Sequence, residues 1–242
     1  MQVQEKTDQI VQWLKSILAN SGAKGFVLGL SGGIDSAVAA ALCKRACPDM
    51  TLGVMMPCYS DPQDLLDARL AADAFSIPVE KIVLDEVFET FVRVLTGVVY
   101  DRNEKDLALA NIKPRLRMTT LYFLAARRKL LVVGTGNKSE IMIGYSTKYG
   151  DGGVDLLPLG GLVKTEVREL ARFLGVPHEI IDKAPSAGLW AGQTDEAEMG
   201  FTYEELDRYI LTGDGRPETR AIIEGMVKRS EHKKMMPPVP PL

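Results

Sequence analysis

Apolar residues follow two spacings along this chain: short continuous runs, and longer stretches in which they recur every three or four positions. The short runs, typical of buried strands, cover residues 25–30, 50–56, 79–84 and 130–134. The longer stretches predict helices over residues 5–19, 61–75, 85–99, 107–128, 164–174, 202–211 and 217–229, with one more beginning near residue 35. Strands alternating with helices predict an α/β fold, a doubly wound and mainly parallel sheet flanked by helices.

The size and composition of the chain limit the classes of protein to which it can belong. With 242 residues, 46% of them hydrophobic, we expect a single domain spanning 1–242. A net charge of −3 without a basic run argues against nucleic acid as a partner. No apolar run reaches membrane-spanning length and the N-terminus lacks a signal-peptide core, so we expect no membrane partner and a cytoplasmic location. Cys43, Cys47 and Cys58 form no disulfide framework, and His178 and His232 are too few for a histidine metal site.

The most informative stretch joins the first predicted strand to the helix that follows it. Strand, glycine turn and helix start form a phosphate-binding geometry, because glycine permits unusual backbone angles and a helix N-terminus favours anions. Neither the Walker loop nor the dinucleotide-binding glycine pattern fits these residues. We expect nucleotide phosphates to contact Gly29, Leu30, Ser31, Gly32, Gly33, Ile34, Asp35 and Ser36.

Asp35 is the unusual residue of this loop. A carboxylate beside bound phosphates repels them unless a cation lies between, so Asp35 points to magnesium. If the first and fourth strands are neighbours across the switch point of the sheet, Glu140 comes close to Asp35, and the two carboxylates suit a magnesium–pyrophosphate site. Two plainer interpretations stay open: Asp35 caps its helix, and Glu140 is a solvated acid at a helix start.

Two segments without periodicity have the character of functional loops. Residues 148–155 combine three glycines with two acids between core elements, which predicts an ordered binding loop, with a surface turn as the alternative. Residues 184–194 are long and irregular, which predicts a mobile lid.

Taken together, these segments resemble the ammonia-dependent NAD synthetase family, which belongs to the pyrophosphate-loop ATP pyrophosphatases. The resemblance implies a Rossmann-like fold of the adenine nucleotide alpha hydrolase-like type. The resemblance covers nearly the whole chain. It rests on Ser31-Gly32-Gly33-Ile34-Asp35-Ser36, Asn111-Ile112-Lys113-Pro114-Arg115-Leu116-Arg117-Met118, Gly134-Thr135-Gly136-Asn137-Lys138-Ser139-Glu140, Thr147-Lys148-Tyr149-Gly150-Asp151-Gly152-Gly153, Lys183-Ala184-Pro185-Ser186-Ala187-Gly188-Leu189 and Glu231-His232-Lys233. The first motif is shared by a whole superfamily, whereas the glycine-acid loop and the order of the set are more specific.

The resemblance implies a two-step amidation. ATP, as co-substrate, adenylates the nicotinate carboxylate of deamido-NAD and releases pyrophosphate, and ammonia then converts the acyl-adenylate into NAD and AMP. It implies Mg²⁺ on Asp35 and Glu140, ATP contacts at Thr135, Lys164 and Ser186 with Lys164 also catalytic, and deamido-NAD contacts at Arg115, Lys148, Asp155, His232 and Lys233. Our candidate for taking the proton of ammonium is Asp151, with Asp155 as a competitor.

Family members form dimers with dinucleotide sites at the subunit interface, which implies a homodimer. The helix expected at 107–128 is compatible with this, because it has more apolar surface than one sheet face requires, at Ile112, Leu116, Thr119, Thr120, Tyr122 and Phe123. No length is left for the glutaminase domain of some relatives, and no cysteine lies in a glutaminase context. Free ammonia is therefore the expected donor, although a separate amidase subunit stays open.

Two other functions stay open on the sequence. One is another ATP pyrophosphatase, such as a GMP synthetase-like core or a tRNA-thiolating enzyme, although neither paired catalytic cysteines nor a basic RNA face is evident. The other is a non-catalytic adenine-nucleotide-binding module. Such a module would need the glycine loop, but not Glu140, Lys164 and the glycine-acid loop together.

Overall fold

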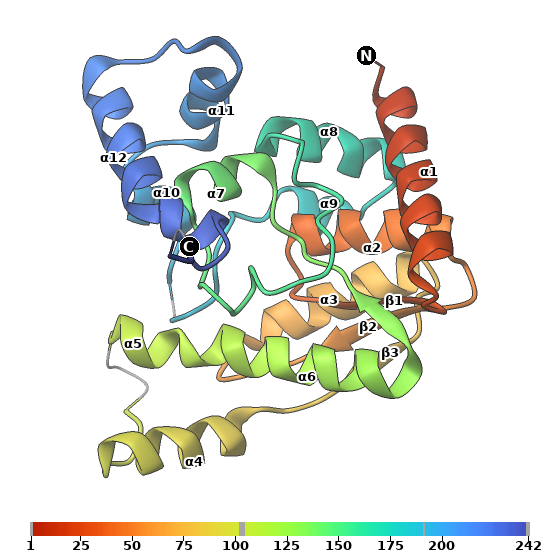
Figure 1. Ribbon diagram of the computed structural model, residues 1–242, viewed down its shortest axis with the longest axis horizontal. Coiled ribbons are helices and arrows are strands. Elements are labelled where there is room, and N and C mark those ends of the chain that lie inside the picture. Colours follow the sequence, from red (N-terminus) through yellow and green to blue (C-terminus); the bar gives the residue numbers. More distant parts are fainter. Residues whose placement is uncertain (1, 102–104, 191, 241–242) are drawn as a thin grey trace.

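A parallel sheet forms the centre of the computed structural model, which describes residues 2–101, 105–190 and 192–240 (Figure 1). In this described chain the strands are β1 (Gly25–Gly29), β2 (Thr51–Met55), β3 (Val79–Lys81) and β4 (Leu130–Val132), in the order β3-β2-β1-β4. All neighbouring strands are parallel, and Phe26 of β1 lies between Thr51 and Leu131. The predicted α/β fold is confirmed, with β3 shorter than the expected run.

One face of the sheet is covered by a layer that contains α1 (Val3–Ser21), α2 (Ile34–Ala46), α3 (Pro62–Ala74), α8 (Lys164–Leu174) and α9 (His178–Ile181). Phe26 and Leu28 of β1 point into this core. The centre of the layer is α2, which is buried over most of its length and contacts both α1 and α8. A helix that is apolar on all sides fits this enclosed position.

The opposite face is covered by α4 (Asp85–Thr96), α5 (Leu107–Ala110) and α6 (Ile112–Arg128), with Phe88 and Leu121 packed against Val27 and Val54. The single helix expected over residues 107–128 is interrupted at Asn111. Pro114 explains the interruption, because proline has no N–H to continue a helix but is tolerated in a first turn.

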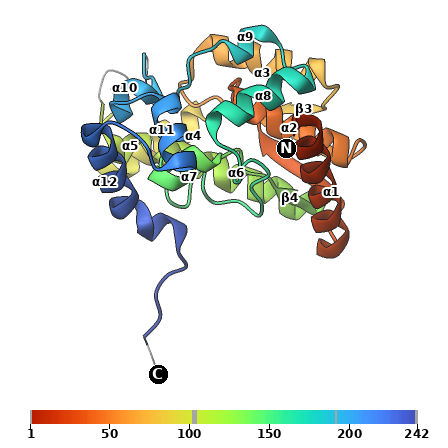
Figure 2. The ribbon, with the colours of Figure 1, turned by 90° about the horizontal axis from the view of Figure 1, so that it is seen from above.

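A smaller group of helices lies beyond the sheet, as Figure 2 shows from above: α7 (Lys138–Ile143), α10 (Asp195–Met199), α11 (Tyr203–Thr212) and α12 (Pro217–Lys234). Ile143, Leu206 and Ile223 belong to its separate apolar core. The sequence did not predict α7, α9 or α10, because four to six residues are too few to show a helical repeat. Within the described residues, no helix combines the length and the apolar character needed to cross a membrane.

The order of the strands creates a switch point between β1 and β4. The chain moves outward from β1 to β2 and β3, and then returns along α6 to pair β4 with the other side of β1. Ligands of such sheets bind at the carboxyl ends of the strands beside this point. The glycine loop follows β1 there, and α7 begins shortly after β4.

The glycine loop uses the conformational freedom of glycine at one position. Gly32 has φ 81°, and a Cβ there would overlap the carbonyl oxygen of Asp64. Gly33 does not use this freedom, since it is extended at φ −92° and ψ 159° and forms the N-cap of α2. The helix therefore begins at Ile34, and Asp35 lies in its first turn rather than capping it.

Replacing Gly32 by Ala is expected to destabilise the protein more than replacing Gly22. Both glycines have positive φ, which costs an L residue roughly 1–2 kcal/mol. A Cβ at Gly22 meets no atom within 4 Å, whereas the one at Gly32 meets main chain and adds about 1–3 kcal/mol of overpacking. Denaturant unfolding of Gly32→Ala beside Gly22→Ala measures the difference, and equal losses would contradict a tightly enclosed loop.

Candidate functional site

The glycine loop is held in shape by its own serines. The Ser36 hydroxyl donates to the Gly33 carbonyl at 2.8 Å and lies 3.1 Å from the Ser31 hydroxyl, which in turn accepts from the Gly33 N–H at 3.3 Å. No side chain caps the first turn of α2. Its N–H groups and its partial positive charge are therefore directed toward the carboxyl edge of the sheet, an arrangement suited to phosphate.

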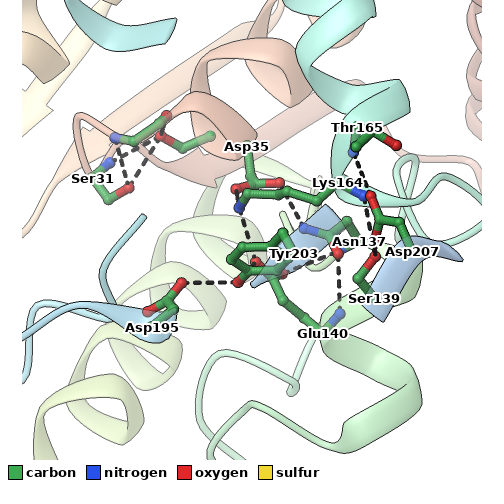
Figure 3. Close-up of polar contacts among 12 residues, drawn as sticks. Ser31, Asp35, Asn137, Ser139, Glu140, Lys164, Thr165, Asp195, Tyr203 and Asp207 are labelled. Carbon is green, nitrogen blue, oxygen red and sulfur yellow. Dashed lines mark hydrogen bonds and ion pairs between the residues drawn. The ribbon is translucent and has the colours of Figure 1, made fainter. Parts of the chain in front are cut away.

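A buried lysine joins two carboxylates beside this loop, as Figure 3 shows. The Lys164 ammonium, on a residue only 2% exposed, lies 2.5 Å from Oδ2 of Asp35 and 3.2 Å from Oε1 of Glu140. The three residues come from the first turns of α2, α7 and α8. The predicted approach of Glu140 to Asp35 is thus present, and it follows from the pairing of β4 with β1.

The charges of this cluster do not balance. Burial by itself lowers the pKa of Lys164, but the two carboxylates outweigh burial and raise it, so the lysine is charged. Burial raises the pKa of Glu140 to about 7, with the Asp35 charge adding to the rise and Lys164 opposing it. One ammonium therefore compensates two desolvated carboxylates incompletely, and a further cation would relieve the excess negative charge.

The acidic pair fits the magnesium that the resemblance implies. Among the described residues no group of three or more His, Cys, Asp or Glu side chains could hold a metal alone. Mg²⁺ does not need such a cage, because it commonly binds one or two carboxylates together with substrate phosphates and water. Asp35 and Glu140 next to a phosphate-type loop supply that donor set.

Asn137 is a member of the cluster that the sequence analysis missed. Its side-chain amide donates to Oδ1 of Asp35 at 2.9 Å, and its side-chain oxygen accepts from the Glu140 N–H in a capping box. Asn followed three residues later by Glu is the sequence signal of this box. Glu140 is thus a helix-start acid, as the plainer interpretation had it, but its side chain is 17% exposed and directed toward Lys164 rather than solvated.

Four of the residues assigned by resemblance to deamido-NAD lie together. The Lys148 ammonium donates to the His232 carbonyl at 2.7 Å, and the Arg115 guanidinium donates to the Lys148 carbonyl at 3.3 Å. Lys233 donates to the carbonyls of Gly144 and Ser146, which fixes the end of α12 beside α7. We call Arg115, Lys148, His232 and Lys233 the basic cluster.

Asp155, the fifth residue of that set, is not part of the basic cluster. Its carboxylate accepts from the Tyr122 hydroxyl at 3.0 Å and from the Val132 N–H at 2.7 Å, and so binds to α6 and β4. Asp151 accepts from the Thr147 N–H at 2.8 Å and is exposed at a turn of the glycine-acid loop. Thr135 lies just beyond β4, half-buried.

The segment predicted as a lid, residues 184–194, forms hydrogen bonds to the chain around it, and Ala191 within it lies outside the described residues. The Asp195 N–H donates to the Pro185 carbonyl at 3.0 Å, which closes the base of the segment. The buried ammonium of Lys113 donates to the Leu189 carbonyl at 2.7 Å. Ser186 is exposed there, and its hydroxyl accepts from Gly188. The mobility of the lid stays a prediction.

Known proteins support the family suggested by these motifs. The family model for NAD synthase matches residues 6–237. The NH(3)-dependent NAD(+) synthetase of Carboxydothermus hydrogenoformans is 54% identical over 99% of this chain and 98% of the relative. Among solved structures, NMN synthetase from Francisella tularensis has a TM-score of 0.94 at 38% identity, and NH3-dependent NAD synthetase from Campylobacter jejuni has 0.81 at 30%, both covering 100% of each chain. The chain therefore belongs to the NAD synthase family.

Proposed function

We propose that this protein is an ammonia-dependent NAD synthetase, a ligase that uses ATP to convert the carboxylate of deamido-NAD into the amide of NAD. The observation that carries the proposal is Lys164, buried between Asp35 and Glu140 beside the N-terminus of α2, in a chain of this family. A GMP synthetase-like core or a tRNA-thiolating enzyme would share the loop, but not a family match over residues 6–237. A non-catalytic nucleotide module would need no such charged cluster.

The first step is adenylation. A nicotinate carboxylate oxygen bonds to the α-phosphorus of ATP, and the bond from that phosphorus to the bridging oxygen breaks, so pyrophosphate leaves with its added negative charge. The N-terminus of α2 and the Lys164 ammonium stabilise this charge, and Thr135 and Ser186 contact ATP. When bound, Mg²⁺ held by Asp35 and Glu140 supplies further charge neutralisation.

In the second step the nitrogen of ammonia bonds to the acyl carbon, the bond to AMP breaks, and the nitrogen loses a proton. Asp151, which is exposed on the glycine-acid loop, is our candidate acceptor, with Asp155 as the alternative. The basic cluster binds the anionic groups of the acid substrate, since guanidinium and ammonium groups pair with phosphate and carboxylate. We expect residues 1–242 to act as one synthetase domain, in the cytoplasm.

A second candidate substrate is nicotinate mononucleotide, the acid form of NMN. The likeness to the NMN synthetase of Francisella tularensis, with a TM-score of 0.94 against 0.81 for the NAD synthetase of Campylobacter jejuni, favours testing it. The chemistry is the same, because both substrates present a nicotinate carboxylate to ATP.

We also propose a homodimer, because the described surface has an uncovered apolar stripe. Val87, Phe91, Val94 and Leu95 follow one side of α4 at helical spacing, and each is at least 45% exposed. On α6, the helix expected to be compatible with a dimer, Ile112 is buried, whereas Thr119 and Phe123 are exposed. Light scattering should give twice the mass of one chain, and a monomer at working concentrations would contradict the proposal.

The function is tested by following pyrophosphate and the nicotinamide product together. Purified protein with ATP and magnesium should release pyrophosphate only when an acid substrate is present, and should form the amide with ammonium but not with glutamine. The ratio of kcat/KM for deamido-NAD and for nicotinate mononucleotide then decides between the two substrates. Absence of pyrophosphate with both acids would contradict the proposed chemistry.

Loss of either acidic residue should remove catalysis without unfolding the chain. Asp35→Ala is expected to lower the rate of pyrophosphate release by roughly 10²–10³, the usual effect of deleting one preorganised electrostatic group. Glu140→Gln should act similarly, and the double variant should be little worse than either, because both residues serve one ion. Asp8→Ala, at an exposed acid of α1, is the control. Near-normal turnover of Asp35→Ala at saturating magnesium would exclude the metal assignment.

Arg115→Ala should raise the KM for the acid substrate much more than the KM for ATP. Its guanidinium belongs to the basic cluster, where it donates to the Lys148 carbonyl rather than to a residue of the glycine loop. We expect it to pair with an anionic group of the acid substrate. Arg69→Ala on α3, where the side chain is 51% exposed, serves as the control in the same steady-state assay. Equal effects on both substrates would assign Arg115 to another role, such as the dimer contact.

A further inference from the structure

Helix α11 directs two buried polar side chains at the site from one face. Tyr203 and Asp207 are one turn apart, and their exposed fractions are 0% and 2%. Residues four apart project from the same side of a helix. The capping box of Thr202 and Glu205 fixes where the helix begins, and therefore which residues face inward. Neither Tyr203 nor Asp207 has a role in the chemistry described above.

Tyr203 contacts the charged end of Lys164. The ammonium lies over the tyrosine ring, 4.8 Å from its centroid, and the tyrosine hydroxyl is 3.4 Å from Oε1 of Glu140 (Figure 3). The same hydroxyl donates to Oδ2 of Asp195 at 2.9 Å, which holds the ring in place. A desolvated ammonium over an aromatic face is attracted to the ring, so Tyr203 confines the ammonium of Lys164.

Asp207 fixes the backbone of the same lysine through its neighbours Thr165 and Ser139. One carboxylate oxygen accepts from the Thr165 N–H at 2.7 Å, and the other accepts from the Ser139 hydroxyl at 2.5 Å. The Ser139 hydroxyl in turn accepts from the Lys164 N–H at 3.1 Å. The N-cap of α8 is Val163, whose side chain cannot accept a hydrogen bond, so Asp207 satisfies the start of α8 from a different helix.

The bond to Ser139 also fixes the second carboxylate of the site. Ser139 precedes Glu140 in α7, while Lys164 opens α8. By bonding to both helix starts, Asp207 sets the distance between the two residues that meet at the acidic cluster. The Tyr203 ring and the Asp207 carboxylate thus act on the side chain and the backbone of one lysine.

We propose that Tyr203 and Asp207 are positioning residues for the adenylation step, which hold Lys164 at both ends and in register with Glu140. The inference rests on the proposed function, because it assigns Lys164 to the pyrophosphate of ATP. A merely structural role is the alternative, since Tyr203 also packs in the apolar core with Met199 and Phe201. That role would act through folding stability and not through Lys164.

The test combines substitutions at α11 with removal of the lysine. Tyr203→Leu and Asp207→Asn should lower both the affinity for magnesium-ATP, measured by calorimetry, and kcat by about 10–100-fold, as removal of a residue that orients a ligand usually does. KM for the acid substrate should not change. Tyr203→Phe keeps the ring and should lose less than Tyr203→Leu. Tyr209→Phe is the matched control, because Tyr209 lies on the same helix and its hydroxyl forms an exposed bond to Glu224 of α12.

A double-mutant cycle separates positioning from structure. In a Lys164→Met background, the same substitutions should weaken magnesium-ATP binding little further, because the group that they position is gone. Equal losses with and without Lys164, or unchanged binding in folded Tyr203→Leu, would overturn the proposal. Thermal unfolding checks each fold, and if Asp207→Asn does not fold, the two Tyr203 variants decide. Calorimetry with magnesium-ATP alone does not depend on which acid is amidated, so failure of the proposed function would be seen separately.

Discussion

The contact between Lys164, Asp35 and Glu140 depends on the whole arrangement of the sheet, because each charge comes from a different helix start. Removing such charges from water is costly, and the cost is offset only where partners are well placed. They are well placed here because β4 pairs with β1, which brings the beginnings of α2 and α7 to one edge. A different strand order would leave buried charges unpaired. The strand order and the charge pairing of the site therefore depend on each other.

This dependence explains why the site is built from helix N-termini. The first turn of a helix has N–H groups without partners, and these need either a capping side chain or a ligand. At α7 the cap comes from Asn137, the residue directly before the helix, and at α8 it comes from Asp207 on another helix. At α2 the first turn has no side-chain cap, and this is the helix that follows the glycine loop. The uncapped start is therefore the one that we expect to bind phosphate.

The features that could be predicted from sequence are those with a local pattern. The alternation of strands and helices gave the parallel sheet, and the glycine turn with Asp35 indicated the phosphate loop. The approach of Glu140 followed from topology alone. Three features depend on tertiary packing and were not predicted. They are the short helices, the contact of Asn137 with Asp35, and the position of Asp155 away from the basic cluster. The exposed stripe on α4 was missed for the same reason, since only the packed structure shows which apolar faces are covered.

The burial of Lys113 has a consequence for residues 184–194, the segment predicted as a lid. Its side chain is buried, its ammonium faces the rings of Phe88 and Tyr100 as well as the Leu189 carbonyl, and burial lowers its pKa. In the described chain no carboxylate forms an ion pair with it. Separating Leu189 from α6 would return water to this ammonium, so the free energy of any opening of the segment would include the hydration of a single charge. That free energy can be changed at Lys113, which is not among the residues expected to contact substrate.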